Sequence, residues 1–106
     1  MSPPVERAMA PAEPRMLDFS IHGPIERADL PGLCERVCAL LAASGAEVAR
    51  CDVRGIQPDA VTVDALARLQ LAARRHRCTV RLVHASRELL ELVSFMALAD
   101  VLPSEG

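Results

Sequence analysis

Two carboxylates lie where a strand is expected to end and the next helix to begin. Asp52 closes an apolar segment, and Asp59 precedes the next helical pattern. Such a pair could serve as general acid and base, or one aspartate could accept a phosphoryl group. A phosphate-accepting aspartate of the receiver type needs a further acidic pair and a lysine, but all 12 basic residues here are arginine. That alternative fails, and turn or helix capping remains for both residues.

The thiols and imidazoles could bind a metal ion or carry redox chemistry. Cys34 and Cys38 are four residues apart, whereas a redox pair is typically C-x-x-C. His76, Cys78 and His84 could be metal ligands, but Cys78 and His84 bracket a strand that holds them apart, and no fourth ligand is evident. We therefore expect reduced thiols packed in the core, no metal ion and no cofactor. The four cysteines are Cys34, Cys38, Cys51 and Cys78.

A cluster of arginines could bind the phosphates of nucleic acid. Five arginines fall in a stretch whose only acid is Asp64. The formal net charge is -2, however, and no aromatic residue is interleaved with them. A solvated helix end, where cations complement the helix dipole, explains them better. We expect no nucleic acid partner, whereas an acidic protein partner stays open. The cluster consists of Arg68, Arg74, Arg75, Arg77 and Arg81.

The length and composition indicate one small domain. The chain has 106 residues, of which 51% are apolar and 25% are charged. No segment is long and apolar enough for a membrane span, and the first residues lack the features of a secretory signal, so we expect a cytoplasmic protein without membrane insertion. The five glycines form no phosphate-binding loop, and there is no nucleophile elbow, which argues against common enzyme classes.

Hydrophobic periodicity divides the chain into alternating strands and helices. Residues 1–15 are rich in proline and lack an apolar period, so we expect a flexible tail, a domain at 16–103 and a frayed end at 104–106. Within the domain, apolar residues alternate in three segments and recur at helical spacing in three others. The expected strands are 16–22, 47–53 and 79–84; the expected helices are 29–44, 62–76 and a last one capped by Ser86 and reaching 96.

The alternating order predicts an α/β fold with a small open sheet, mostly parallel or mixed. Each helical crossover is long enough to return the chain in parallel. In such sheets, ligands and partners bind where strand carboxyl ends lead into helix amino ends. The loop from Asp52 to Asp64 lies at such an edge, so we expect the function there.

Four segments, in their order and spacing, are similar to the motifs of one known family. C-D-V-R-G-I from Cys51 is similar to a strand ending D-[LV]-x-x-[VI], and V-R-L-V from Val80 to a strand L-x-L-V. S-R-E-L-L-E-L-V from Ser86 and L-A-D-V-L from Leu98 are similar to the last helix and the L-x-x-[VIL]-[LF] ending. These motifs belong to the STAS domain of bacterial anti-sigma factor antagonists. The resemblance covers residues 16–103 and implies a STAS-like fold.

The resemblance implies a role in protein interaction rather than catalysis. In typical members, a serine kinase that is itself the anti-sigma factor phosphorylates the second serine of a D-S-S-G-L-G loop at a helix amino end. The unphosphorylated antagonist binds that kinase and frees the sigma factor. Phosphate adds nearly two negative charges to the interface, so repulsion and desolvation break the contact.

This chain departs from the family at the phosphorylated position. The loop aligns with Asp59-Ala60-Val61-Thr62-Val63-Asp64, so the acceptor position is Val61, which has no hydroxyl. Thr62 is the only hydroxyl in the loop, and we expect it to cap the helix rather than to accept phosphate. Val61 and Val63 make the loop more apolar, which suits a constitutive contact. Ala97 stands where the family often has glycine, and strains that corner if the backbone there needs a positive φ.

We therefore expect a non-enzymatic regulator that resembles an anti-sigma factor antagonist and docks on an anti-sigma factor or serine kinase domain. Two alternatives remain open: a STAS subunit of a lipid-transport ABC system, and, from another class, a small thiol or metal enzyme. The residues expected to contact the partner are Asp52, Asp59, Ala60, Val61, Thr62 and Val63.

Overall fold

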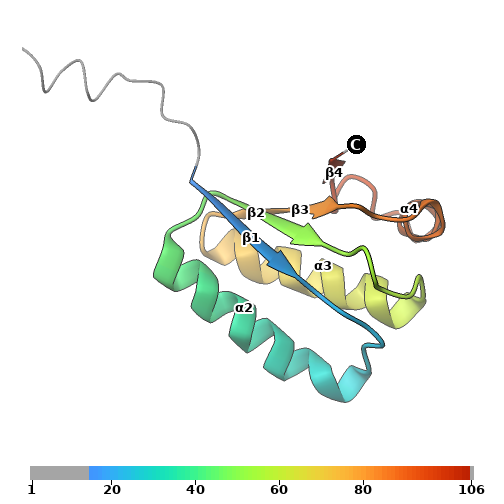
Figure 1. Ribbon diagram of the computed structural model, residues 1–106, viewed down its shortest axis with the longest axis horizontal. Coiled ribbons are helices and arrows are strands. Elements are labelled where there is room, and N and C mark those ends of the chain that lie inside the picture. Colours follow the sequence, from blue (N-terminus) through green and yellow to red (C-terminus); the bar gives the residue numbers. More distant parts are fainter. Residues whose placement is uncertain (1–14, 106) are drawn as a thin grey trace, which may run out of the picture.

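The computed structural model describes residues 15–105, in which strands and helices alternate along the chain (Figure 1). The three predicted strands and three predicted helices are all present, with boundaries within two residues of those expected. No helix within the described residues is long and apolar enough to cross a bilayer. The elements are β1 (Met16–Ser20), the 3-10 helix η1 (Arg27–Asp29), α2 (Leu30–Ser44), β2 (Val48–Asp52), α3 (Ala60–Arg75), β3 (Thr79–Val83), α4 (Arg87–Phe95) and β4 (Ser104–Glu105).

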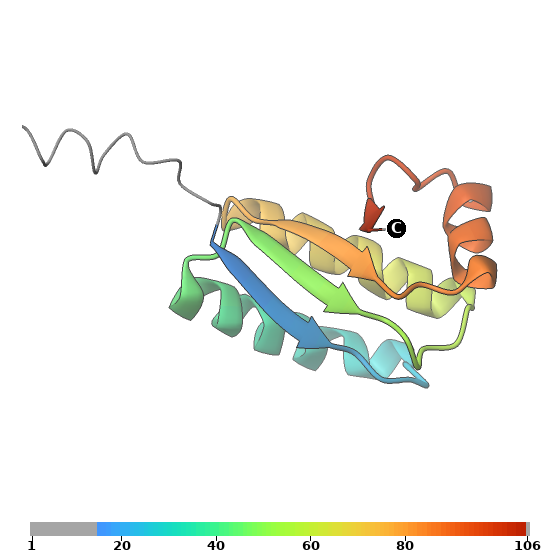
Figure 2. The same cartoon turned by 45° about the horizontal axis from the view of Figure 1, so that its top comes forward.

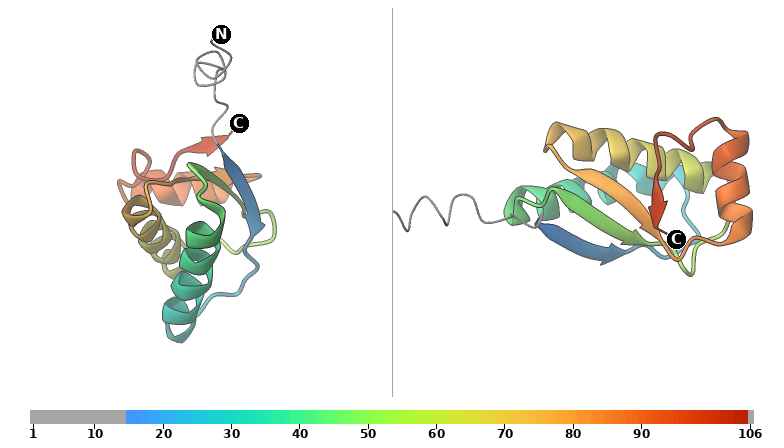
Figure 3. Two further views of the ribbon diagram at one scale, coloured as in Figure 1. Left: turned by 90° about the vertical axis from the view of Figure 1, so that its left-hand side faces the viewer. Right: turned by 90° about the horizontal axis from the view of Figure 1, so that it is seen from above.

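All four strands run parallel and follow one another across the sheet in chain order, β1-β2-β3-β4. Because successive crossovers have the same hand, α2 and α3 cover the same face of the sheet (Figures 1 and 3). Helix α4 lies instead beyond the carboxyl ends of the strands, where it packs against α3 (Figure 2). The predicted α/β fold with an open, mostly parallel sheet is confirmed.

The two faces of the sheet differ in the polarity and the burial of their side chains. Ala49, Cys51 and Leu82 point toward the helices and are fully buried. Asp18 and Arg81, on the alternate positions of their strands, are exposed on the opposite face. No described helix covers that second face (Figure 3). The core is therefore a single layer between the sheet and α2 and α3, and the sheet presents a polar surface to solvent.

The chain after α4 adds an edge strand that the sequence analysis did not predict. Ser104 and Glu105, expected to fray, pair with Leu82 and Val83 of β3. The carbonyl of Pro103 also accepts a hydrogen bond from the N–H of Leu82 at 2.9 Å. The sheet thus extends past residue 103. Strand β4 was not predicted because two residues are too few to show an alternating pattern. Gly106 and residues 1–14 of the expected tail lie outside the described residues.

Helix α4 ends in an alanine with a left-handed backbone conformation. Ala97 has a φ of 61°. Its N–H donates to the carbonyl of Ser94 at 2.9 Å, and the N–H of Leu98 donates to Val93 at 2.9 Å, which together form a Schellman motif. Glycine favours this position, because a Cβ there costs about 1–2 kcal/mol. The positive φ on which the expected strain at Ala97 depended is therefore present.

Replacing Ala97 with glycine is expected to raise the free energy of unfolding by about 1 kcal/mol, because glycine adopts this conformation without strain. Urea denaturation followed by circular dichroism measures the change. The matched control is Ala39→Gly in the exposed middle of α2, which should lower stability by about 1 kcal/mol. Equal losses in both variants would contradict the prediction.

Candidate functional site

The loop between β2 and α3 is held in place by backbone hydrogen bonds and by two buried side chains. The N–H of Val53 donates to the carbonyl of Val83 at 3.0 Å, and the N–H of Ile56 donates to Val53 at 3.2 Å. The side chains of Val53 and Ile56 belong to the core and are 1% and 7% exposed. The remainder of the loop is thus presented to solvent at a fixed place, at the carboxyl edge of the sheet.

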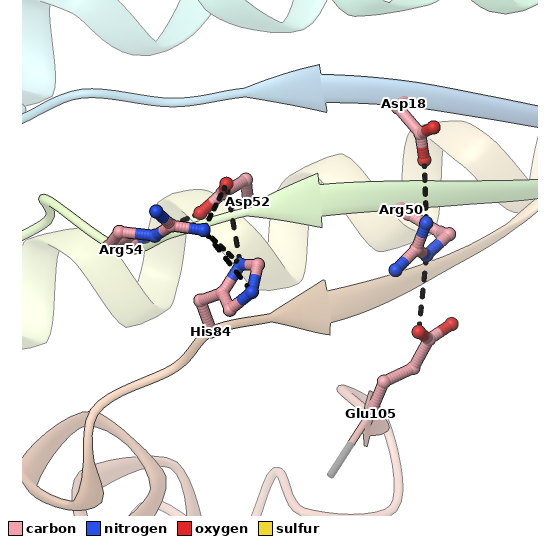
Figure 4. Close-up of polar contacts among 6 residues, drawn as sticks. All are labelled: Asp18, Arg50, Asp52, Arg54, His84 and Glu105. Carbon is pink, nitrogen blue, oxygen red and sulfur yellow. Dashed lines mark hydrogen bonds and ion pairs between the residues drawn. The ribbon is translucent and has the colours of Figure 1, made fainter.

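Asp52 forms the centre of a polar cluster at this edge (Figure 4). Its Oδ1 accepts a hydrogen bond from the backbone N–H of Arg54 at 2.9 Å. Its Oδ2 lies 3.4 Å from Nδ1 of His84 and 3.7 Å from Nη2 of Arg54. The same Nη2 lies 3.0 Å from Nδ1 of His84. Asp52 therefore ties the start of the loop to the end of β3.

These contacts keep Asp52 ionised. The backbone hydrogen bond from Arg54 lowers the pKa of Asp52, partial desolvation opposes it, and the charges of Arg54 and His84 add to the lowering. A lowered folded-state pKa stabilises the protein above the unfolded-state pKa, and that contribution is lost as the pH falls through the folded-state value. Asp52 is thus a carboxylate that holds a turn, in agreement with the capping role considered for it.

Asp59 is the N-cap of α3. Its Oδ1 accepts a hydrogen bond from the backbone N–H of Thr62 at 2.8 Å. Ala60, the first helical residue, is exposed, and Val61 is partly buried against the core. The carboxylate of Asp59 is therefore committed to the helix, and the first two side chains of α3, Ala60 and Val61, are apolar and at least partly exposed.

Two of the residues expected to contact a partner are buried. Thr62 and Val63 are both 0% exposed, because the helical period turns them toward the sheet. The expectation that Thr62 caps the helix is also wrong, since Asp59 does so and the helix begins at Ala60. The Thr62 hydroxyl has no hydrogen-bond partner among the described residues. Neither side chain can meet a partner or a kinase in this conformation.

Replacing Thr62 with valine is expected to raise the free energy of unfolding by about 1 kcal/mol. Valine has nearly the same shape and removes a buried hydroxyl that lacks a partner. Thermal and urea unfolding measure the change, and Thr79→Val on the exposed face of β3 serves as the control, with little expected effect. A loss of stability in Thr62→Val would show that the hydroxyl is bonded in solution.

Two polar residues that connect distant segments carry no local signal in the sequence. Arg50 lies between two carboxylates on the open face of the sheet, with Nη1 3.4 Å from Asp18 and Nε 3.1 Å from Glu105 (Figure 4). Gln70 is fully buried and hydrogen-bonds the backbone of Val80 and of Val101. Both bridge elements that are far apart in the chain, so no local pattern marks them.

His76, Cys78 and His84, which were considered as metal ligands, do not form one site. No group of three or more potential metal ligands lies together within residues 15–105. Cys51 and Cys78 are buried, and burial, with Asp52 nearby, raises the pKa of Cys51 to about 12. His84 belongs to the cluster around Asp52, whereas His76 is exposed at the end of α3. The Cys51 thiol thus stays protonated and is a poor nucleophile at neutral pH.

The arginines of the cluster lie in different local environments. Arg68 forms an ion pair with Asp64, with Nε 3.0 Å from Oδ2, and Arg27 approaches the same oxygen at 3.7 Å. Arg74 and Arg75 lie in the last turn of α3, where cations complement the helix dipole. Arg74 and Arg75 thus agree with the expected solvated helix end, whereas Arg81 lies on β3, away from it.

The class defined by these observations is a small α/β domain with a parallel sheet covered on one face by helices and a fixed loop at its carboxyl edge. No protein-family model and no curated protein matches the sequence. The fold, by contrast, is similar to solved structures.

One similar structure is the NMR structure of the protein TM1081, with a TM-score of 0.68 and 10% sequence identity over 85% of this chain and 73% of that one. Another is the anti-sigma factor antagonist SpoIIAA in its unphosphorylated form, with a TM-score of 0.65 and 7% identity over 89% and 83% of the two chains. The STAS-like α/β fold expected from the sequence resemblance is thus confirmed by its similarity to SpoIIAA.

Proposed function

We propose that this protein is a non-enzymatic, cytoplasmic interaction module that acts like an anti-sigma factor antagonist. It docks on an anti-sigma factor or serine kinase domain through the carboxyl edge of its sheet. The contact surface consists of Asp52, Asp59, Ala60 and Val61, with Thr62 and Val63 supporting it from the core. The similarity of the fold to SpoIIAA supports this proposal.

The single observation that carries the proposal is the apolar start of α3. Ala60 is exposed and Val61 is partly exposed, and both follow the capped turn at Asp59. Aliphatic side chains on a fixed helix end suit a packed protein contact, because they are buried there without loss of hydrogen bonds. With no hydroxyl at Val61 and none accessible at Thr62, the contact is permanent rather than switched by phosphate.

The purified protein is expected to gain no phosphate when it is mixed with ATP and an anti-sigma serine kinase encoded in the same genome. Intact-mass spectrometry checks this, and isothermal titration calorimetry measures binding to the same kinase in parallel. Binding without phosphorylation supports the proposal. One phosphoryl group mapped to residues 59–64 contradicts a permanent contact, and absence of binding contradicts the docking.

The alternative role, as a subunit of a lipid-transport ABC system, predicts a different partner. Affinity purification of the full chain from its native host distinguishes the two. Recovery of a transporter ATPase in place of the kinase would assign the same edge of the domain to that system.

A further inference from the structure

Cys34 and Cys38 form a pair of accessible thiols on α2. They are one helical turn apart, so their side chains lie on the same face of the helix. Both are free and partly exposed, whereas Cys51 and Cys78 are buried. Burial raises the pKa of Cys34, the neighbouring Cys38 raises it further, and the charge of Arg68 lowers it. The chain therefore places two sulfur ligands side by side at its surface.

The two thiols line one groove between α2 and α3. Leu71 and Ala72 provide its apolar part, Arg68 and Arg75 provide positive charge, and Glu35 adds one negative charge. Arg68 is ion-paired with Asp64, with Nε 3.0 Å from Oδ2, so part of its charge is already offset. The sulfurs are thus partly desolvated and lie among side chains of both charges.

A disulfide does not fit this pair. Cβ atoms four residues apart on a helix are about 5–6 Å apart, whereas a disulfide needs about 3.5–4.5 Å. Oxidation would therefore have to unwind α2. A metal ion between the two sulfurs bridges the longer span, because each metal–sulfur bond adds about 2.3 Å.

We propose that Cys34 and Cys38 bind one Cu⁺ ion in a two-coordinate site. Soft thiolates select Cu⁺ among biological metals, and Cu⁺ accepts two ligands, whereas structural Zn²⁺ requires four. As each S–Cu bond forms, that thiol releases its proton to solvent, and copper keeps its oxidation state. Two thiolates and Cu⁺ carry a net charge of −1; of the charged residues in the groove, Arg68 and Arg75 favour this complex and Glu35 opposes it. This site is independent of the docking edge.

The test is an anaerobic titration of the full chain with Cu⁺ in competition with the chromogenic chelator bicinchoninate. One equivalent of Cu⁺ is expected to bind, and Cys34→Ser and Cys38→Ser should each weaken binding by about 100-fold or more. Cys78→Ser is the matched control with a buried thiol and should bind like the wild type. Arg68→Gln should weaken binding by about 10-fold, in keeping with an outer-shell role.

Thiol alkylation gives a second readout that does not depend on any variant. Iodoacetamide is expected to modify two cysteines of the folded protein, and one equivalent of Cu⁺ should protect both, as peptide mass spectrometry will show. Binding that survives Cys34→Ser, or protection confined to Cys51 and Cys78, would overturn the proposal. So would dimer formation at half an equivalent of Cu⁺, since the ion would then bridge two chains.

Discussion

Replacing Gln70 with methionine is expected to lower the free energy of unfolding by about 3 kcal/mol and the melting temperature by about 15 °C. The side-chain amide of Gln70 supplies the hydrogen bonds that the backbone of a neighbouring β-strand would otherwise make with Val80. Its Nε2 donates to the carbonyl of Val80 at 3.0 Å and to that of Val101 at 2.7 Å. Its Oε1 accepts a hydrogen bond from the N–H of Val80 at 2.8 Å.

The size of this effect follows from what the substitution leaves behind. Strand β4 pairs only with Leu82 and Val83, so the backbone of Val80 at the same edge depends on Gln70. Methionine keeps the volume and the apolar contacts, but removes the partners of the buried N–H and carbonyl of Val80 and of the partly buried carbonyl of Val101. Each such group costs about 1–3 kcal/mol, partly offset because methionine needs no partner of its own.

Urea denaturation and calorimetry measure the loss. The control is Gln57→Met, which makes the same chemical change in the exposed part of the β2–α3 loop and should alter stability by less than about 0.5 kcal/mol. If Gln70→Met is as stable as the wild type, water or another donor satisfies Val80 and the bridging role is wrong.

The order of elements was predictable because the signals that set it are local. Alternating apolar residues in β1 and the helical spacing of Leu30, Val37 and Leu41 are visible in short windows of sequence. Ser86 was predicted as a cap, and its hydroxyl accepts the hydrogen bond from the N–H of Leu89 at 3.1 Å. Burial of Cys51 and Cys78 agrees with the expectation of thiols packed in the core. For Cys34 and Cys38 that expectation is wrong, because both lie on α2 where they are only partly buried.

The errors concern features that depend on tertiary contacts or on competition between neighbours. Asp59 and Thr62 are both good N-cap residues. Asp59 becomes the N-cap because of the register in which α3 packs against the sheet. That register also buries Thr62 and Val63, which an alignment of the loop by motif placed at the surface. Arg50 bonds Glu105 across 55 positions of sequence, which no window can detect.

Replacing Val61 with aspartate is expected to weaken binding to the anti-sigma kinase domain by about 30-fold or more while leaving the fold intact. Val61 is the second residue of α3 and is only partly buried. Aspartate is favourable in the first turn of a helix because it interacts with the helix dipole, so the unfolding free energy should change by less than about 1 kcal/mol. In the complex, by contrast, the added charge would be desolvated without a partner.

Two companion variants decide whether the effect belongs to this position. Ala39→Asp adds the same charge to the exposed middle of α2 and should bind the kinase like the wild type. Val61→Ser removes apolar surface and adds a hydroxyl, but adds no charge. Its affinity for the kinase should therefore fall by less than about 10-fold. Because the two residue-61 variants differ chiefly in charge, affinity that falls equally in both would point to lost packing rather than repulsion. Unchanged affinity in Val61→Asp, measured by calorimetry on protein shown to be folded, would place the docking surface elsewhere on the domain.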